Sequence, residues 1–156
     1  MIDSKDREIM TIIQDNARIA AAEIARQVGM AHSAVFERIK KLEEKGIVRG
    51  YSASIEPHAL GLGLLAFILV KSTGECEAVG RALADIPGVQ EVHHIAGDDD
   101  YLVKIRTAGP EALGKILRED FKSVPGLRGT RTTVVLDTIK ETTRLPVARA
   151  AAAAEA

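Results

Sequence analysis

Apolar residues recur at the spacing of an amphipathic helix in three stretches before residue 45. These stretches carry Ile9, Ile12 and Ile13; then Ile24 and Val28; then Val35, Ile39 and Leu42, with Phe36 beside them. Gly29 and Gly46 follow the second and third stretches, where a helix end favours a residue that tolerates a left-handed backbone. Ile47 and Val48 predict a short strand, with residues 49–51 as its turn. The pattern predicts three helices and a two-stranded wing, the layout of a winged helix-turn-helix.

The second half of the chain alternates between strand and helix patterns and repeats itself. Residues 64–71 form an unbroken apolar run, which is typical of a strand at the centre of a sheet. Ile-Pro-Gly-Val at 86–89 and Val-Pro-Gly-Leu at 124–127 each join a helix to a strand. Strand–helix–strand twice over predicts a ferredoxin-like βαββαβ domain, so the expected fold class is α+β. The remaining elements are expected as a helix over 77–85, strands over 89–95 and 101–107, a helix over 110–121 and a last strand over 130–137.

These two patterns also predict the domain boundaries. Pro57 and Gly61 indicate a linker between the domains. The alanine-rich end of the chain is short and lacks an apolar stripe, so we expect it to be frayed. The expected division is a winged helix-turn-helix over 1–52, a linker over 53–61, the ferredoxin-like domain over 62–142 and a tail over 143–156.

The predicted sheet leaves one face open, because its two helices cover only the other face. Depending on strand register, Ile68, Val103 and Val135 would lie on that open face. A second subunit is the natural cover for such a surface. We therefore predict an obligate homodimer that assembles further, to an oligomer such as an octamer.

Composition and charge limit the cellular compartments and the binding partners that fit this chain. The formal net charge is −1, so any site for a polyanion must be local. The apolar run over 62–70 is too short to cross a bilayer, and the first ten residues lack the basic start and apolar core of a secretory signal. Cys76 is the only cysteine, which excludes an intramolecular disulfide and a cysteine zinc cluster. We expect a cytoplasmic protein in which Cys76 is a structural bystander.

Positive charge gathers on the third predicted helix and the turn after it, at Arg38, Lys40, Lys41, Lys45 and Arg49. A solvated helix face is one interpretation of such a cluster. Because a short helix and a glycine turn precede it, the same cluster also fits a recognition helix that binds double-stranded DNA.

A long and specific set of residues between Ile2 and Leu65 carries a family resemblance. The set is Ile2-Asp3, Asp6-Arg7, residues 14–19 (QDNARI), Glu23-Ile24-Ala25, Val28-Gly29-Met30, Glu37-Arg38-Ile39, Leu42-Glu43 and residues 46–51 (GIVRGY). It resembles the N-terminal half of the leucine-responsive regulator (Lrp)/AsnC family of transcription factors. Two positions depart from the family pattern, since Ala20 and Ala31 stand where a capping residue is usual at the starts of the second and third helices. Ser33 is expected to cap the third helix from a shifted position.

The resemblance implies a sequence-specific transcriptional regulator that presents two third helices to successive major grooves. We expect base-edge contacts from His32, Ser33, Glu37 and Arg38. We expect phosphate contacts from Arg18, Lys41 and Arg49.

The acidic turn at residues 96–101 (AGDDDY) is the candidate small-molecule site. Gly97 permits a turn whose N–H groups could bind a carboxylate, and a nearby aspartate could hold an ammonium group. From these residues alone, a solvated acidic hairpin with a loosely held divalent cation is an open alternative. The resemblance favours the first interpretation, because Gly97, Asp100 and Tyr101 match the family's Gly-x-x-Asp-aromatic motif for a free amino-acid effector between subunits. The full expected set is His94, Gly97, Asp98, Asp99, Asp100 and Tyr101, together with Thr133, Val134 and Val135 from the last strand.

No enzymatic motif is found in the sequence, which lacks HExxH, GxSxG, a P-loop and GxGxxG. His93 and His94 are adjacent on a predicted strand and would point to opposite faces, so we expect no metal site and no cofactor. Two alternatives remain: an amino-acid sensor that no longer binds DNA, and a tetrapyrrole decarboxylase of similar fold. The second would need basic and histidine side chains in the sheet cleft, where this chain has acids.

Overall fold

The chain forms two compact units, which we describe separately. The computed structural model describes residues 2–73 and 76–147, except for the side chain of Cys76. One unit comprises residues up to 54 together with residues from 141 onward, and the other comprises residues 55–140. The boundary at 54–55 lies inside the predicted linker. The prediction that Cys76 is a bystander and that residues 148–156 are frayed falls outside the described residues.

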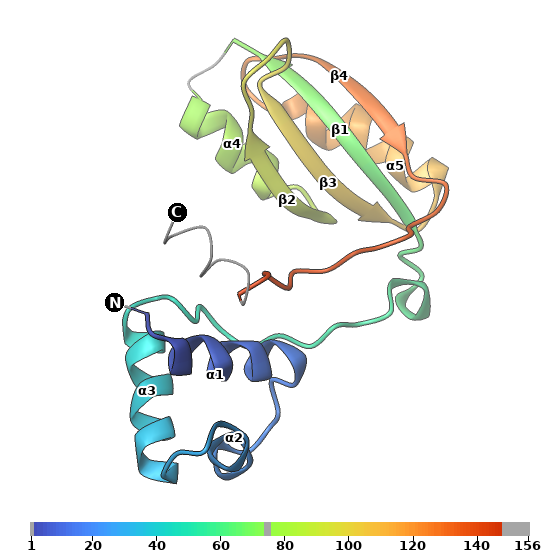
Figure 1. Ribbon diagram of the computed structural model, residues 1–156. Coiled ribbons are helices and arrows are strands. Elements are labelled where there is room, and N and C mark those ends of the chain that lie inside the picture. Colours follow the sequence, from blue (N-terminus) through green and yellow to red (C-terminus); the bar gives the residue numbers. More distant parts are fainter. Residues whose placement is uncertain (1, 74–75, 148–156) are drawn as a thin grey trace. The chain divides into compact units, whose positions relative to one another are not determined.

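The described part of the first unit contains three helices around one small core (Figure 1): α1 (Ser4–Asp15), α2 (Ala21–Val28) and α3 (His32–Glu44). The predicted apolar faces meet there, with Ile9, Ile24 and Val35 almost completely buried. Asp3 caps α1 in a reciprocal arrangement: the Asp6 N–H donates to the Asp3 carboxylate, and the Asp3 N–H donates to the Asp6 carboxylate. Such a box satisfies two backbone donors at the helix start.

The strand predicted at Ile47 and Val48 does not form; residues 45–56, all of them described, contain no strand. The Ile47 and Val48 N–H groups both donate to the Leu42 carbonyl, at 2.9 and 3.1 Å. Gly46, in a left-handed conformation, allows the chain to fold back in this way. These donors complete the end of α3 and are therefore not available to a β-ladder.

The starts of α2 and α3 are held without side-chain caps. Ala20 and Ala31 are the residues at these positions, and within the described chain neither helix has a side-chain hydrogen bond there. Ser33 lies inside the first turn of α3, so the expectation that it acts as a shifted cap is wrong. Each missing cap typically costs about 1 kcal/mol of helix stability.

The second unit is the predicted ferredoxin-like domain. A short 3₁₀ turn, η1 (Pro57–Leu60), precedes a four-stranded antiparallel sheet with strand order β2-β3-β1-β4. The last strand begins three residues earlier than predicted and ends before Leu136, whose side chain is 99% exposed. The elements are β1 (Leu64–Ser72), α4 (Cys76–Ala84), β2 (Val89–His94), β3 (Tyr101–Thr107), α5 (Pro110–Ile116), the π-helical turn η2 (Leu117–Phe121) and β4 (Leu127–Val134).

Helices α4 and α5 cover the same face of this sheet (Figure 1). Ile68 and Val103 are paired neighbours on the covered face and are fully buried, so the expectation that they lie on the open face is wrong. Side chains alternate along a strand, so the open face carries the residues between them, including the half-buried Phe67, Leu69 and Leu102. The sequence of a strand shows that its side chains alternate between two faces, but it does not show which of the two groups of side chains faces the helices.

Residues 141–147 fold back onto the first unit. The Gln14 side-chain amide donates to the Leu145 carbonyl at 3.2 Å, and the Leu145 N–H donates to the Gln14 amide oxygen at 2.8 Å. Arg144 forms an ion pair with Asp15 beside them. The start of the predicted tail is therefore part of the first unit.

None of the helices within the described residues is long and apolar enough to cross a membrane.

Candidate functional sites

The third helix separates its residues into a buried and an exposed face. Val35 and Leu42 are buried in the first unit. Successive helical residues are rotated by about 100°, so Ser33, Glu37 and Lys40 point away from that core, and all three are exposed. These residues form the outward face of α3.

Arg38 does not belong to the outward face. Its guanidinium donates to the carboxylates of Asp3 and Asp6, each at 2.7 Å, and so links α3 to the start of α1. The Asp6 N–H and then Arg38 lower the pKa of Asp3, and the two carboxylates raise the pKa of Arg38. The side chain that we expected at a base edge is thus held against the start of α1, where 31% of its surface is exposed.

The other residues predicted to contact DNA all expose their side chains: Arg18, His32, Ser33, Glu37, Lys41 and Arg49. Lys41 and Lys45 line one flank of α3, in a surface hollow that also includes Glu37 and Arg38. Lys40 is paired with Glu44 at 3.9 Å on the exposed surface, where such a pair contributes little. The cations that remain at the surface of α3 and the turn after it are therefore Lys40, Lys41, Lys45 and Arg49.

The Tyr51 side chain ties the segment after α3 back to this helix. Its hydroxyl donates to the Glu43 carboxylate at 2.8 Å. Partial burial, and then Glu43, raise the pKa of Tyr51 to about 12. The path of the chain beyond Arg49 is therefore fixed by a side-chain contact instead of a wing strand.

In the acidic loop, Asp100 is used by the fold itself. Its carboxylate accepts from the Ser72 N–H at 2.6 Å and from the Ser72 hydroxyl at 3.3 Å. Its own N–H donates to Val70, and its carbonyl accepts from Ile95. Asp100 thus joins the loop to the end of β1, and its role in the predicted effector set remains a prediction.

The other two aspartates differ in their exposure. Asp99 forms an ion pair with Arg131 of β4 at 2.5 Å, whereas Asp98 is exposed. Gly97 has φ of +151°, a conformation that side chains rarely adopt, and a Cβ there would meet open space. Asp98 and the Gly97 backbone are therefore the polar groups of the exposed part of the loop, residues 96–98.

Tyr101 and His94 lie on the helix-covered side of the sheet. Tyr101 is 2% exposed, and its ring centroid lies 5.2 Å from that of His94. A Cβ on Gly80 would lie 3.4 Å from the Tyr101 ring, so this glycine lets α4 approach the ring closely. Both rings line a surface hollow of about 510 Å³ together with Glu77, Gly80, Arg81, Ala84 and Val92.

Residues 133–135 of the predicted effector set lie away from this loop within one chain. Val134 pairs with Ala66, whereas Tyr101 pairs with Val70, four residues further along β1. At about 3.3 Å per residue, these positions are separated by about 13 Å along the strand. The fold of one chain does not bring the two halves of the predicted pocket together.

Metal-ligating side chains do not gather in the described residues, which contain no group of three or more His, Cys, Asp or Glu positioned to hold an ion. His93 and His94 point to opposite faces, as predicted. His93 contacts Glu91 at 3.2 Å, and His94 packs on Tyr101. Lys104, and then His93, lower the pKa of Glu91.

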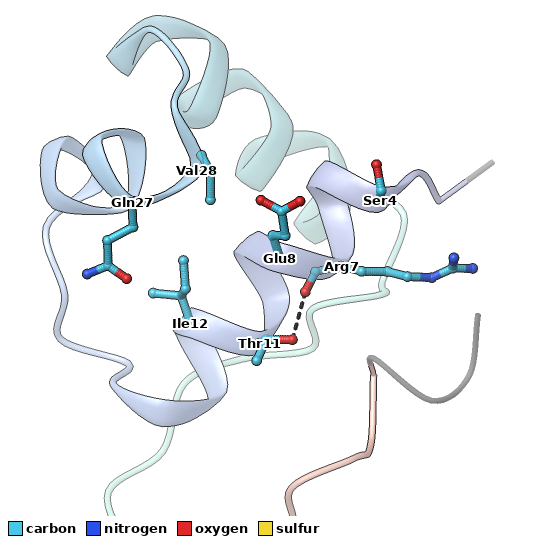
Figure 2. A pocket seen from close by; sticks show the side chains of 7 residues that line it. All are labelled: Ser4, Arg7, Glu8, Thr11, Ile12, Gln27 and Val28. Carbon is cyan, nitrogen blue, oxygen red and sulfur yellow. Dashed lines mark hydrogen bonds between the residues drawn. The ribbon is translucent and has the colours of Figure 1, made fainter. Parts of the chain in front are cut away.

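Another hollow, of about 540 Å³, lies between α1 and α2 (Figure 2). It shares no residue with the predicted DNA or effector sets. The Thr11 hydroxyl at its rim donates to the Arg7 carbonyl at 2.9 Å, a bond internal to α1. Its lining is Ser4, Arg7, Glu8, Thr11 and Ile12 from α1, and Gln27 and Val28 from α2.

Sequence reasoning missed three positions at these sites. Phe36 was placed beside the buried stripe but is 55% exposed, and a helical wheel centred on Val35 and Leu42 would have shown it on the border of the outward face. Arg131 was missed because its ion pair with Asp99 joins residues 32 positions apart, which no local pattern indicates. The role of Ser72 depends on strand register, which local sequence does not reveal.

A three-helix unit with an exposed basic helix, followed by a ferredoxin-like unit with an acidic loop, defines a two-domain ligand-responsive regulator. Residues 2–49 match the winged helix-turn-helix DNA-binding family, and residues 65–145 match the Lrp/AsnC ligand-binding domain. The chain belongs to the Lrp/AsnC family of DNA-binding transcriptional regulators. This membership confirms the family predicted from sequence, the fold class and the expectation that the chain is not an enzyme.

Known proteins resemble the chain over nearly its full length. The HTH-type transcriptional regulator FL11 of Pyrococcus horikoshii is 43% identical over 147 residues, which cover 94% of this chain and 97% of that protein. The leucine-responsive regulatory protein of Escherichia coli is 33% identical over 150 residues, covering 94% and 92%. A transcriptional regulator from Neisseria meningitidis, solved in complex with L-methionine, superposes with a TM-score of 0.90 at 29% identity, covering 96% of this chain and 99% of that one.

Proposed function

We propose that this protein is a cytoplasmic homo-oligomeric regulator that binds double-stranded DNA through α3 and responds to a free amino acid at the β2–β3 loop. The observation that carries the DNA-binding part is the exposed face of α3, which stands opposite a buried face and is flanked by free cations. A helix presented in this way fits the major groove, and its first residues reach the base edges.

The proposed interface divides into base and phosphate contacts. His32, Ser33 and Glu37 lie in the first half of α3 and are exposed, so we assign them to base edges. We assign Arg18, Lys41 and Arg49 to phosphates, because their charges are at the surface. Since Arg38 is bound to Asp3 and Asp6, it serves to orient α3, and it reaches DNA only if those contacts are released.

A homodimer would cover the open face of the sheet. Phe67, Leu69 and Leu102 are only half-buried there. Aliphatic and aromatic side chains at such a face gain about 25 cal/mol for each Å² removed from water. A two-fold pair would also present two α3 helices to DNA, one for each half-site.

The amino-acid site would be completed by another subunit. In this proposal Asp98 holds the ammonium group and the Gly97 backbone meets the carboxylate. Asp99, Asp100, Tyr101 and His94 shape the loop from behind. Thr133, Val134 and Val135, which within one chain are displaced from Tyr101 by about 10–17 Å along the strands, would come from a neighbouring copy. The L-methionine complex of the Neisseria meningitidis regulator supports an amino acid as ligand.

The test of DNA binding is a selection of duplexes from a random library, followed by titration of the enriched duplex at several salt concentrations. We expect affinity to fall with salt. Because each substitution removes one phosphate contact from both half-sites of a dimer, Lys41→Ala and Arg49→Ala should each reduce the slope of log K against log salt by about 2. Lys122→Ala, an exposed lysine in the other unit, is the matched control and should leave the slope unchanged. If wild-type protein binds no duplex even at low salt, the alternative of a sensor without DNA binding is correct; equal binding of enriched and random duplexes would refute sequence-specific recognition.

The ligand is tested by measuring thermal unfolding with each of the twenty amino acids. A ligand at 100 times its Kd stabilises the folded state by about 2.7 kcal/mol, which gives a clear shift in Tm. Asp98→Asn should abolish that shift and preserve DNA binding. A shift that survives Asp98→Asn would place the ligand elsewhere.

A further inference from the structure

Phe36 is an exposed aromatic side chain on α3 that the fold of this unit does not use. It is 55% exposed, and it is absent from the core formed by Ile9, Ile24, Val35 and their neighbours. Large apolar side chains at such exposure are common singly on surfaces. The position of this one gives it significance, because it lies in the middle of the proposed reading helix.

The helical period places Phe36 beside the polar residues of the outward face. It lies one turn after Ser33 and one turn before Lys40, so these three side chains follow one another along the helix. Ser33 and Glu37 are the other exposed residues of this part of the helix. Glu37 can accept a hydrogen bond from cytosine and Ser33 can bond to several bases, but a phenyl ring can do neither.

The major groove offers one apolar group at its base edges, the C5-methyl group of thymine. We propose that Phe36 contacts this methyl group and thereby specifies thymine at one position of each half-site. This inference rests on the proposed DNA-binding function and adds a specificity determinant to it. Burying one methyl group is equivalent to about a fourfold gain in affinity, or about fifteenfold over the two half-sites of a dimer.

The test uses the duplex enriched by wild-type protein, in which each symmetric pair of thymines is replaced in turn by deoxyuridine. This replacement removes only the methyl group. We expect one pair whose replacement weakens wild-type binding by about fifteenfold and weakens binding by Phe36→Ala by about twofold or less. Phe36→Leu, which keeps an apolar contact, should retain part of the discrimination.

Leu60→Ala is the matched control, because Leu60 is 63% exposed and lies in the other unit. It should discriminate thymine from deoxyuridine as wild type does. Thermal unfolding and gel filtration of Phe36→Ala should match wild type, since the ring is not packed in the chain.

Two results would overturn the inference about Phe36 and leave the proposed function intact. In one, every thymine replacement affects wild type and Phe36→Ala equally. In the other, Phe36→Ala dissociates the oligomer, which would make Phe36 a protein contact. Failure of wild-type protein to enrich any duplex is a different result and refutes the proposed function itself.

Discussion

The recognition helix and the acidic loop both contain a charged residue that the sequence marked as a ligand contact and that the fold uses for itself. On α3 this residue is Arg38, which binds Asp3 and Asp6; in the loop it is Asp100, which binds Ser72. The helix and the loop differ in the charged side chains that remain exposed. The helix and the turn after it keep Lys41, Lys45 and Arg49 at the surface, whereas the loop keeps only Asp98 of its three aspartates exposed.

The difference comes from the geometry of the two elements. A helix distributes its residues over all sides, so a side chain that is held by a neighbouring helix leaves others facing outward. A loop between two strands must satisfy the ends of those strands, and its polar side chains are the nearest groups that can do so. The charge of a loop is therefore a weaker guide to ligand binding than the charge of a helix face.

Replacing Arg38 should have the largest effect on stability. Arg38→Ala leaves the almost buried Asp6 carboxylate without a cation, which we expect to cost about 2–3 kcal/mol in the free energy of unfolding. Chemical denaturation measures this cost. Titration of the folded Arg38→Ala protein with DNA measures any separate change in DNA affinity. Arg38→Lys should recover part of the stability. If Arg38→Ala unfolds like wild type yet loses DNA affinity strongly, Arg38 is a DNA contact and its ion pairs are incidental.

Replacing Asp100 comes next. Asp100→Ala removes the acceptor of two hydrogen bonds from Ser72 and should cost about 1–2 kcal/mol, with loss of the amino-acid response because the loop is no longer held. Asp100→Asn keeps an acceptor oxygen and should retain most of the stability and most of the amino-acid response. Ser72→Ala removes only the 3.3 Å hydroxyl contact and is the control. A response that is lost in Asp100→Asn with stability unchanged would show direct ligand contact.

Acid should weaken the two units through different carboxylates. Hydrogen bonds from Arg26, and then Gln27, lower the pKa of Glu23 from its usual 4.5 to about 2. A lowered pKa stabilises the folded state fully above 4.5, and this contribution is lost as the pH falls from 4.5 to about 2. Glu23→Gln should therefore flatten the pH dependence of the urea midpoint in this window for the first unit. Glu91→Gln should flatten the pH dependence of the urea midpoint only for the second unit. If each variant instead changed the pH dependence of the other unit, these ion pairs would not be the source of the acid sensitivity.

The smallest effect is expected at the C-terminal segment. Gln14→Ala removes two hydrogen bonds to Leu145 at the surface and should cost about 0.5–1 kcal/mol. Hydrogen exchange of the Leu145 amide should speed up in this variant, while exchange in β1 stays unchanged. Gln27→Ala, on the same unit but without contact to the segment, provides the comparison.

Elements with a strong periodicity of apolar residues could be predicted from the sequence. Features that depend on which distant residues pair with each other could not. Ile9, Ile24 and Val35 gave the three helices, and the repeated Pro-Gly turns gave the ferredoxin-like topology. The wing strand failed because Ile47 and Val48 donate their N–H groups to Leu42. The contacts of Arg38 and Asp100 join residues that are 28 or more positions apart, and no local pattern encodes such distances.

The return of residues 141–147 to the first unit has a practical consequence for anyone who dissects this protein. A fragment cut after Ser54 lacks Arg144 and the Leu145 main chain, so Asp15 and Gln14 lose the groups that they hold in the intact chain. Measurements on such a fragment should be paired with the full chain before operator affinities are compared.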